Sequence, residues 1–166
     1  MLRIEHEILL WLQRHRSEFG NTFWWTITQT GYSRMWLPFC AFLTLLPVTQ
    51  QFRLPLWNAL GIQAVFVHVL LKKGMKRSRP FDACPEIVPV GKRPKDWSFP
   101  SGHTCITFVT AFIFLQYGSF LGPVLLAYAC MVAFSRLYLG VHYPTDVLGG
   151  ILLAILILAL TCLFWL

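Results

Sequence analysis

Charged residues are scarce in this chain, and acidic side chains are half as common as basic ones. Only 13% of the 166 residues are charged, with 7 acidic and 14 basic side chains, whereas 56% are hydrophobic. A soluble domain usually has about 25% charged residues, so this composition excludes an ordinary soluble protein. The sequence predicts one membrane-embedded domain that comprises residues 1–166.

Recognisable metal and redox spacings are also missing. None of the five cysteines forms a C-x-x-C pair, and the histidines and carboxylates are too sparse for a metal cluster, so we expect no metal and no cofactor. No long stretch alternates with the period of a β-strand. Because lipid admits only helices or closed barrels, the expected fold is all-α.

Long apolar runs are what the chain has instead. Five of them are expected to be transmembrane helices: roughly residues 35–48, 55–71, 104–118, 120–139 and 147–166. The last run is uncharged and reaches the length of about 20 residues that a bilayer span needs. The other runs are near or below this length, and their succession favours a helical bundle over residues 35–166.

The first 34 residues show a different pattern. Ile4 and Trp11 belong to an apolar face with charged neighbours, which is typical of an amphipathic helix at a membrane surface. Asn21 is a candidate N-cap of a second short helix, which Gly31 would end. We therefore expect two interfacial helices here; ordinary surface helices packed on the bundle are the alternative.

Three polar blocks interrupt the apolar pattern, and their cations suit phosphate binding. Lys72 and Arg79 belong to a basic run, and Arg136 lies within an apolar stretch. Arginine offers a planar fork and lysine a point charge to phosphate oxygens. The basic run alone also fits a surface that attracts anionic lipid or a nucleic-acid patch, but the apolar surroundings argue against nucleic acid.

The second block has the features of an anion-binding helix start. Pro100 stops a preceding helix, and Ser101 is a good N-cap. The amides around Ser101, Gly102 and His103 would point at an anion from the helix N-terminus. Gly102 would let the backbone approach the ligand closely.

The third block supplies a histidine and a carboxylate at a suitable spacing. His142 is the candidate nucleophile, and Asp146, four residues later, can orient its ring. His103 would then act as general acid and base. The residues alone leave open which of the two histidines attacks phosphorus.

These blocks resemble a known set of signature motifs. Lys72-x6-Arg79-Pro80, Pro100-Ser101-Gly102-His103 and Ser135-Arg136-x5-His142-x3-Asp146 are similar to the three motifs of the type-2 phosphatidic acid phosphatase family. The resemblance implies a membrane lipid phosphate phosphatase in which His142 attacks, His103 transfers protons and Asp146 orients His142. The first 34 residues carry no motif.

The resemblance also implies the substrate class. We expect a lipid phosphate at the bilayer: phosphatidic acid, phosphatidylglycerol phosphate or a polyprenyl diphosphate of envelope synthesis such as undecaprenyl diphosphate. Two rival hypotheses remain: a phosphotransferase with the same residues, and a non-enzymatic protein that binds or transports lipid phosphates. The rival binding protein has no need of two histidines and a carboxylate.

Two opposing signals bear on the side of the membrane at which the motif blocks lie. Most Lys and Arg residues lie on the side of the motifs, and the positive-inside rule would place that side in the cytoplasm. Phosphate chemistry itself requires several of these charges. The resemblance favours a site on the outer face of a bacterial cytoplasmic membrane.

Overall fold

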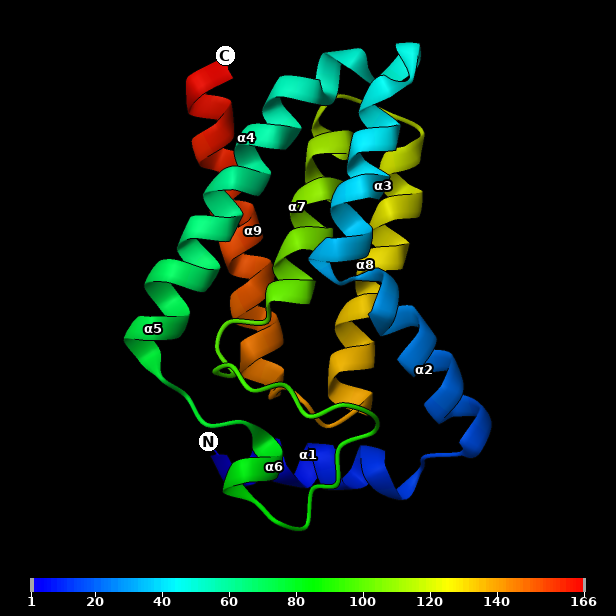
Figure 1. The fold of residues 1–166 in the computed structure, drawn as a ribbon, viewed down its shortest axis with the longest axis vertical. Helices are drawn as coiled ribbons and strands as arrows, with labels where there is room; N and C mark the ends of the chain where they lie inside the picture. Colours follow the sequence, from blue (N-terminus) through cyan, green and yellow to red (C-terminus); the bar gives the residue numbers. More distant parts are fainter. Residues whose placement is uncertain (1, 166) are drawn as a thin grey trace.

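The computed structural model describes residues 2–165, in which helices are the only regular secondary structure (Figure 1). In chain order the elements are α1 (Leu2–Arg14), α2 (Glu18–Thr30), α3 (Ser33–Leu45), the 3-10 helix η1 (Pro47–Phe52), α4 (Arg53–Ala64), the π-helix η2 (Val65–Leu71), α5 (Lys72–Met75), α6 (Pro80–Ala83), α7 (Gly102–Gln116), α8 (Leu121–Tyr138) and α9 (Pro144–Trp165). The expected all-α fold is confirmed for this part of the chain.

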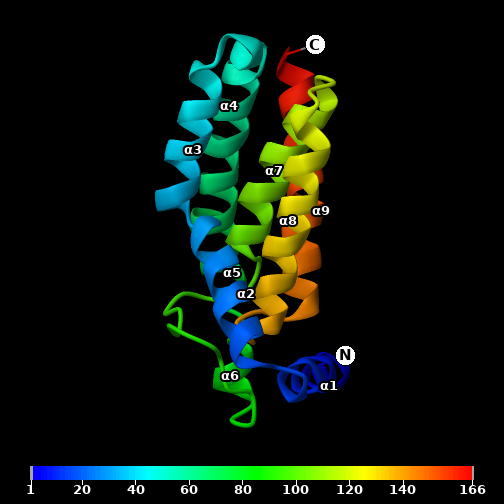
Figure 2. The ribbon, with the colours of Figure 1, turned by 90° about the vertical axis from the view of Figure 1, so that its right-hand side faces the viewer.

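Helix α7 lies at the centre of the bundle and contacts α4, α8 and α9 (Figures 1 and 2). Most of its side chains are buried, including Phe108 and Phe114. Fully buried alanines, Ala111, Ala129 and Ala154, come from α7, α8 and α9 respectively. Small residues at these positions let the helix backbones approach closely, as in membrane bundles.

The outside of the bundle is apolar as well. Leu148, Leu152 and Ile155 of α9 and Val124 of α8 are exposed, which suits a surface that faces lipid. Three segments are long and apolar enough to cross a membrane, Thr49–Ala83, Leu121–Tyr138 and Pro144–Leu163, and α7 is apolar but shorter. These are three of the five expected spans; five crossings stay a prediction.

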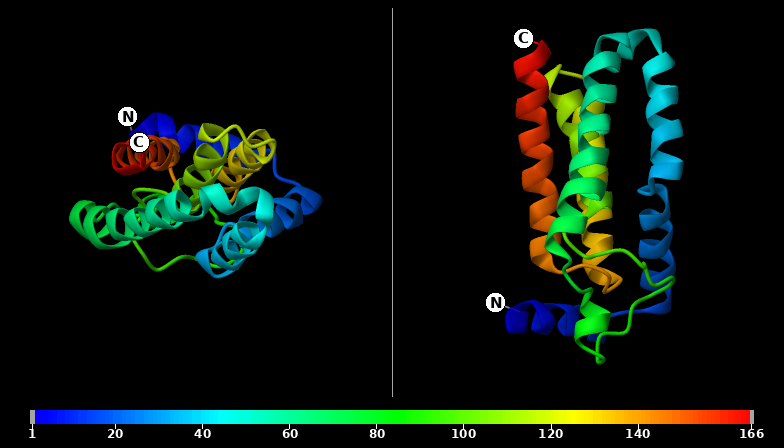
Figure 3. Two further views of the ribbon diagram at one scale, coloured as in Figure 1. Left: turned by 90° about the horizontal axis from the view of Figure 1, so that it is seen from above. Right: turned by 60° about the vertical axis from the view of Figure 1, so that its left-hand side comes forward.

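The polar segments gather at one end of the bundle. Helix α1 lies across this end, next to α6 and the long loop that leads to α7, and the C-terminus is at the opposite end (Figures 1 and 3). All three motif blocks begin or end here, because α5, α7, α8 and α9 each have one terminus at this end. The bundle thus brings the blocks together.

The first 34 residues form two helices, as expected, but the second begins earlier than predicted. Ser17 caps α2 by accepting a hydrogen bond from the Gly20 amide at 3.0 Å. Asn21 is therefore not the N-cap but lies within the first turn and a half of the helix. Gly31 does end α2. Helix α2 packs against α8, and the interfacial location of both helices stays a prediction.

Close packing of α7 and α9 sets the second motif block against the third. A Cβ atom on Gly150 would lie 2.8 Å from the Ser101 carbonyl oxygen and 3.1 Å from the Thr104 Cβ. Contacts below about 3.0 Å force atoms to move, so only glycine permits this approach. The Ser101 amide also donates a hydrogen bond to the Asp146 carbonyl at 3.0 Å.

Candidate active site

Lys72 and Arg79 of the first block are both buried and turned toward the bundle. Lys72 directly follows the π-helix η2, and Arg79 precedes the short helix α6. Their exposed fractions are only 7% and 3%. A left-handed residue, Lys76 with φ of 42°, ends α5 between them and turns the chain. Two cations are thus held together in a poorly solvated place, where their attraction for an anion is strong.

Asp96 is the carboxylate that both cations share. It forms a salt bridge with Lys72, and its Oδ1 accepts a hydrogen bond from Arg79 Nη2 at 2.7 Å. Burial acts to raise the pKa of Asp96, but the hydrogen bond to Lys72 and the charges of Lys72 and Arg79 outweigh it and hold that pKa well below its ordinary value. Asp96 therefore stays ionised and screens the two cations.

Arg136 and His103 complete the wall of the site. Arg136, in the last turn of α8, is 2% exposed and donates a hydrogen bond from Nη1 to the hydroxyl of Thr28 on α2. Its Nε has no hydrogen-bond partner among the residues that the structure describes. His103, at the start of α7, packs edge-on against the Tyr32 ring at 4.3 Å, and its buried Nε2 is also without a partner. Buried unpaired donors of this kind are suited to receive a ligand.

Ser101 and Gly102 shape the start of α7. Ser101 is the N-cap, as predicted, and its Oγ accepts a hydrogen bond from the Thr104 hydroxyl at 2.9 Å. A Cβ on Gly102 would make ordinary contacts, 3.5 Å from Val67 and 3.8 Å from His68. Helix packing therefore does not require glycine at position 102. Gly102 contributes to the site as part of the cavity wall.

His142 lies in the loop between α8 and α9, with its two ring nitrogens in different surroundings. Its Nε2 is 3.3 Å from Arg79 Nη1, and its Nδ1 is 3.5 Å from Asp146 Oδ2. The second distance marks an electrostatic contact, not a well-formed hydrogen bond. Burial, followed by the charges of Arg79, Arg136 and Lys72, lowers the pKa of His142 well below its ordinary value. The ring is therefore neutral and can act as a nucleophile.

Asp146, in the first turn of α9, is fully buried and strongly held. Its Oδ1 accepts a hydrogen bond from Arg77 Nη1 at 2.6 Å, and its Oδ2 accepts one from the Tyr143 amide at 2.8 Å and another from the Ser98 hydroxyl. A buried carboxylate needs such donors to remain charged. The geometry fixes Asp146 on the Nδ1 side of His142, whereas Arg79 lies on the Nε2 side.

A cavity of about 150 Å³ lies where these side chains meet. It is lined by six of the eight predicted site residues: Lys72, Arg79, Gly102, His103, Arg136 and His142. Ser101 and Asp146 are the two that do not line it, since they lie behind Gly102 and His142. The cavity has room for several water-sized groups, each about 30 Å³.

Sequence reasoning missed several residues that border or support the cavity. Tyr32 and His68 line it, Thr28 holds Arg136, and Arg77 holds Asp146. Asp96, in the loop that leads to α7, binds two of the site cations. Among these residues, only His68 gave a signal in the sequence, because it is a polar residue within an apolar run. Thr28, Tyr32 and Asp96 lie outside the motifs, and Arg77 is one of the six variable positions between Lys72 and Arg79.

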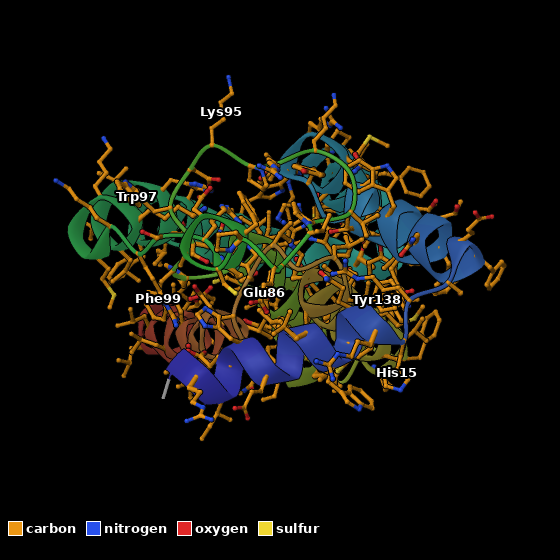
Figure 4. The ribbon with its side chains drawn as sticks, turned by 90° about the horizontal axis from the view of Figure 1, so that it is seen from below. His15, Glu86, Lys95, Trp97, Phe99 and Tyr138 are labelled. Atoms are coloured by element: carbon orange, nitrogen blue, oxygen red, sulfur yellow. The ribbon has the colours of Figure 1, made fainter. Side chains whose placement is uncertain are left out.

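The loop over this end carries further cations that turn outward. Lys95 points away from the body of the protein, and Trp97 follows it on the same loop (Figure 4). Both are exposed. Within residues 2–165, no three His, Cys, Asp or Glu side chains are grouped so that they could hold a metal ion. The cavity is thus a cationic site lined by three histidines: His68, His103 and His142.

Known proteins are similar to this chain in sequence and in fold. Residues 53–166 match the family model described as PAP2 superfamily. An undecaprenyl-diphosphatase of Sulfolobus acidocaldarius is 30% identical over 128 residues, which are 76% of this chain and 62% of that protein. Phosphatidylglycerophosphatase B of Bacillus subtilis is 31% identical over 147 residues, 79% of this chain and 68% of the relative. The chain thus spans less than two thirds of the first relative's length.

A solved structure agrees over nearly the whole chain. The crystal structure of LpxE from Aquifex aeolicus superposes with a TM-score of 0.82 at 26% sequence identity, and the match covers 94% of this chain and 93% of that one. The matched family region contains all three motif blocks, and the fold that carries them is the same. This chain belongs to the PAP2 superfamily.

Proposed function

We propose that the protein is an integral membrane phosphatase that hydrolyses a lipid phosphomonoester or diphosphate through a phosphohistidine, without a metal ion. One observation carries this proposal: three buried cations and the motif histidines His103 and His142 line one cavity at the end of an apolar helical bundle. The cations supply the charge stabilisation that phosphoryl transfer needs. The histidines supply a nucleophile and a proton donor.

The first step forms a covalent intermediate on His142. Nε2 of His142 faces the cations, so this nitrogen attacks phosphorus while the bond from phosphorus to the lipid oxygen breaks. His103 donates a proton to the leaving oxygen. Asp146, beside Nδ1, stabilises the positive charge that develops on the imidazole ring.

The second step returns the enzyme to its starting state. Water attacks the phosphorus of the phosphohistidine, and His103 accepts a proton from that water. The bond from phosphorus to His142 Nε2 then breaks and inorganic phosphate leaves. Lys72, Arg79 and Arg136 hold the phosphoryl oxygens throughout both steps.

The lipid tail is expected to stay among the helices. A second, apolar cavity of about 430 Å³ lies between α3 and α8, with Trp36, Phe39, Leu125 and Tyr128 in its walls. Thr30 and Met35 line it, and Gly31, Tyr32 and Ser33, which lie between these two in the chain, line the cationic cavity. An acyl or prenyl chain in the apolar cavity would therefore present its phosphate to His142.

The names of the relatives suggest which lipids to test. An undecaprenyl-diphosphatase and a phosphatidylglycerophosphatase are among them, so a polyprenyl diphosphate and phosphatidylglycerol phosphate are the first candidates, beside phosphatidic acid. We place the site on the outer face of a bacterial cytoplasmic membrane, with five helical crossings and α1 and α2 in the interface. The apolar exterior of the bundle supports its insertion in a membrane, and the outward orientation rests on the family resemblance.

Phosphate release by the purified protein in detergent, with chelator present, tests the proposal. The substrates are the three candidate lipids, and a His142→Ala variant is compared with His15→Ala, which removes an exposed histidine outside the cavity. We expect turnover in the presence of chelator that disappears only in His142→Ala. No release from any lipid, or equal release by His142→Ala, would overturn the proposal. Appearance of the phosphate on an added acceptor instead of in solution would identify a phosphotransferase.

A further inference from the structure

Glu5 is a buried carboxylate in a helix that carries no motif. It lies in α1, which crosses the catalytic end of the bundle (Figures 1 and 4), and only 5% of it is exposed. Its Oε1 accepts hydrogen bonds from the amide and the hydroxyl of Thr145, the residue before Asp146. Its Oε2 accepts one from Arg77 Nη2 at 2.7 Å. Burying a charge is costly unless it is paired in this way. The contacts of Glu5 therefore fix its carboxylate beside the first turn of α9.

Arg77 joins Glu5 to the candidate active site. While Nη2 binds Glu5, Nη1 donates to Asp146 Oδ1 at 2.6 Å and to the Thr145 hydroxyl at 2.6 Å. The guanidinium group also lies over the Tyr143 ring, 4.1 Å from its centre. One planar cation therefore connects two carboxylates from opposite ends of the chain, a geometry that lysine cannot reproduce.

The connection acts on how Asp146 meets His142, together with the Tyr143 amide and the Ser98 hydroxyl that donate to Asp146 Oδ2. Arg77 occupies Oδ1, whereas Oδ2 faces His142 Nδ1 at 3.5 Å. Because Glu5 neutralises Arg77, the guanidinium does not pull the whole carboxylate toward itself. Without Glu5, Arg77 would keep Asp146 as its only carboxylate partner, and the field of an uncompensated cation would oppose positive charge on the His142 ring.

We propose that Glu5 and Arg77 are positioning residues for phosphoryl transfer: their ion pair holds the Asp146 carboxylate at His142 and makes the N-terminal helix part of the active site. The inference rests on the proposed function for its reaction but not for its geometry. It predicts that loss of the Glu5 carboxylate, which is remote from the phosphate, slows the chemical step and leaves substrate binding nearly unchanged.

A matched pair of variants separates this role from simple removal of a charge from α1. Glu5→Gln removes the buried carboxylate, and Glu7→Gln removes an exposed one that pairs with Arg3 at 3.2 Å in the same helix. We expect Glu5→Gln to lower kcat roughly ten- to a hundredfold, as misplacement of a catalytic group does, with KM nearly unchanged. Glu7→Gln is expected to match the wild type. Arg77→Lys should resemble Glu5→Gln, because lysine cannot bind both carboxylates.

A double-mutant cycle tests whether Glu5 acts through Asp146. If it does, Glu5→Gln has little further effect on kcat in an Asp146→Asn background, since the carboxylate that it positions is gone. An equal loss of kcat in both backgrounds would overturn the inference. The inference would also be overturned if Glu5→Gln unfolded at a lower temperature while kcat per folded enzyme stayed the same. That result would mean that Glu5 only stabilises the packing of α1 on the bundle.

A measurement that needs no turnover distinguishes failure of the inference from failure of the proposed function. The nitrogen NMR signals of the His142 ring, assigned by their loss in His142→Ala, report whether Nδ1 carries the proton. We expect the Nδ1–H form in the wild type and Glu7→Gln, and a changed proton distribution in Glu5→Gln. If the wild type hydrolyses no lipid phosphate, the proposed function fails and these signals alone decide the inference. Identical signals in both glutamate variants would overturn it.

Discussion

Asp96 holds the same two cations that the proposed mechanism assigns to phosphate. Its carboxylate binds Lys72 and Arg79, and about half of its side chain, 51%, remains exposed. A phosphate oxyanion offers the same kind of acceptor as a carboxylate. Phosphate that enters the cavity therefore competes with Asp96 for both partners.

Replacing Asp96 with Asn should make inorganic phosphate a better inhibitor. A hydrogen bond to a charged group contributes about 1.5–3 kcal/mol, and about 1.4 kcal/mol corresponds to tenfold in affinity. We expect Asp96→Asn to lower the inhibition constant of phosphate roughly tenfold, measured against lipid hydrolysis. Asp82→Asn, which changes an exposed aspartate near the same block, is the control. Unchanged or weaker inhibition in Asp96→Asn would mean that Asp96 does not compete.

His142 has a predictable response to pH. Its pKa is lowered by burial and then by Arg79, Arg136 and Lys72, so the ring takes up a proton only below the ordinary histidine pKa of about 6.5. Because the neutral ring is the nucleophile, activity should persist as the pH falls through about 6.5 and be lost only at lower pH. A proton NMR titration of the ring checks this. A midpoint at or above about 6.5 would contradict it.

At the scale of the element, α2 belongs to the active site although it carries no motif. It supplies Thr28, the partner of Arg136, and the chain that follows it supplies Tyr32 against His103. Contacts between α2 and α8 hold these groups in place. The cationic wall of the cavity therefore depends on the packing of a helix for which the sequence predicted an interfacial position or packing on the bundle, but no part in the site.

The isosteric change Thr28→Val tests this dependence. It removes the hydroxyl that accepts from Arg136 Nη1 and leaves a buried donor without that partner, at a cost of about 1.5–3 kcal/mol for a charged group. We expect kcat/KM to fall at least tenfold. Thr26→Val, which alters an exposed threonine of the same helix, should leave kcat/KM unchanged. Equal kinetics for the two variants would show that Arg136 does not need Thr28.

Helix boundaries followed local rules where capping chemistry was strong. Ser101 does cap α7, and α9 begins at Pro144, a residue favoured at the first helical position. The predicted start of α2 at Asn21 was wrong. Ser17 and Asn21 are both residues that cap helices well, and in the structure Ser17 is the N-cap. The π-helix at 65–71 had no signature in the sequence, since it is a local adjustment of an otherwise regular helix.

At the scale of the whole molecule, the catalytic cavity and the C-terminus lie at opposite ends of the bundle (Figure 1). The exposed residues Lys95 and Gln51 mark these two ends, since Lys95 is in the loop at the catalytic end and Gln51 is in η1 at the other. If the catalytic end faces outward, the η1 end faces the cytoplasm.

Cysteine labelling in intact cells tests this orientation. In a Cys84→Ser background, a membrane-impermeant maleimide should label Lys95→Cys at once and Gln51→Cys only after lysis. Cys84 is replaced because it lies partly exposed in the same catalytic-end loop. The opposite pattern would place the active site on the cytoplasmic side, as a literal count of basic residues predicts.

The sequence by itself determined the class of structure and the reactive groups. Its apolar runs require helices, because backbone groups in lipid can bond only within a segment. The three motif blocks identified the three cations and two of the three histidines that line the cavity. These features are local: a residue type at a short spacing is enough to define them.

Only the tertiary structure decided what surrounds those groups. Glu5, Thr28 and Arg77 act across the bundle, and Glu5 meets Arg77 over 72 positions of the chain. Asp96 binds its cations from a loop without regular structure. Such contacts depend on how helices cross and where a loop folds back, and charge and burial then act through space, independently of distance along the chain.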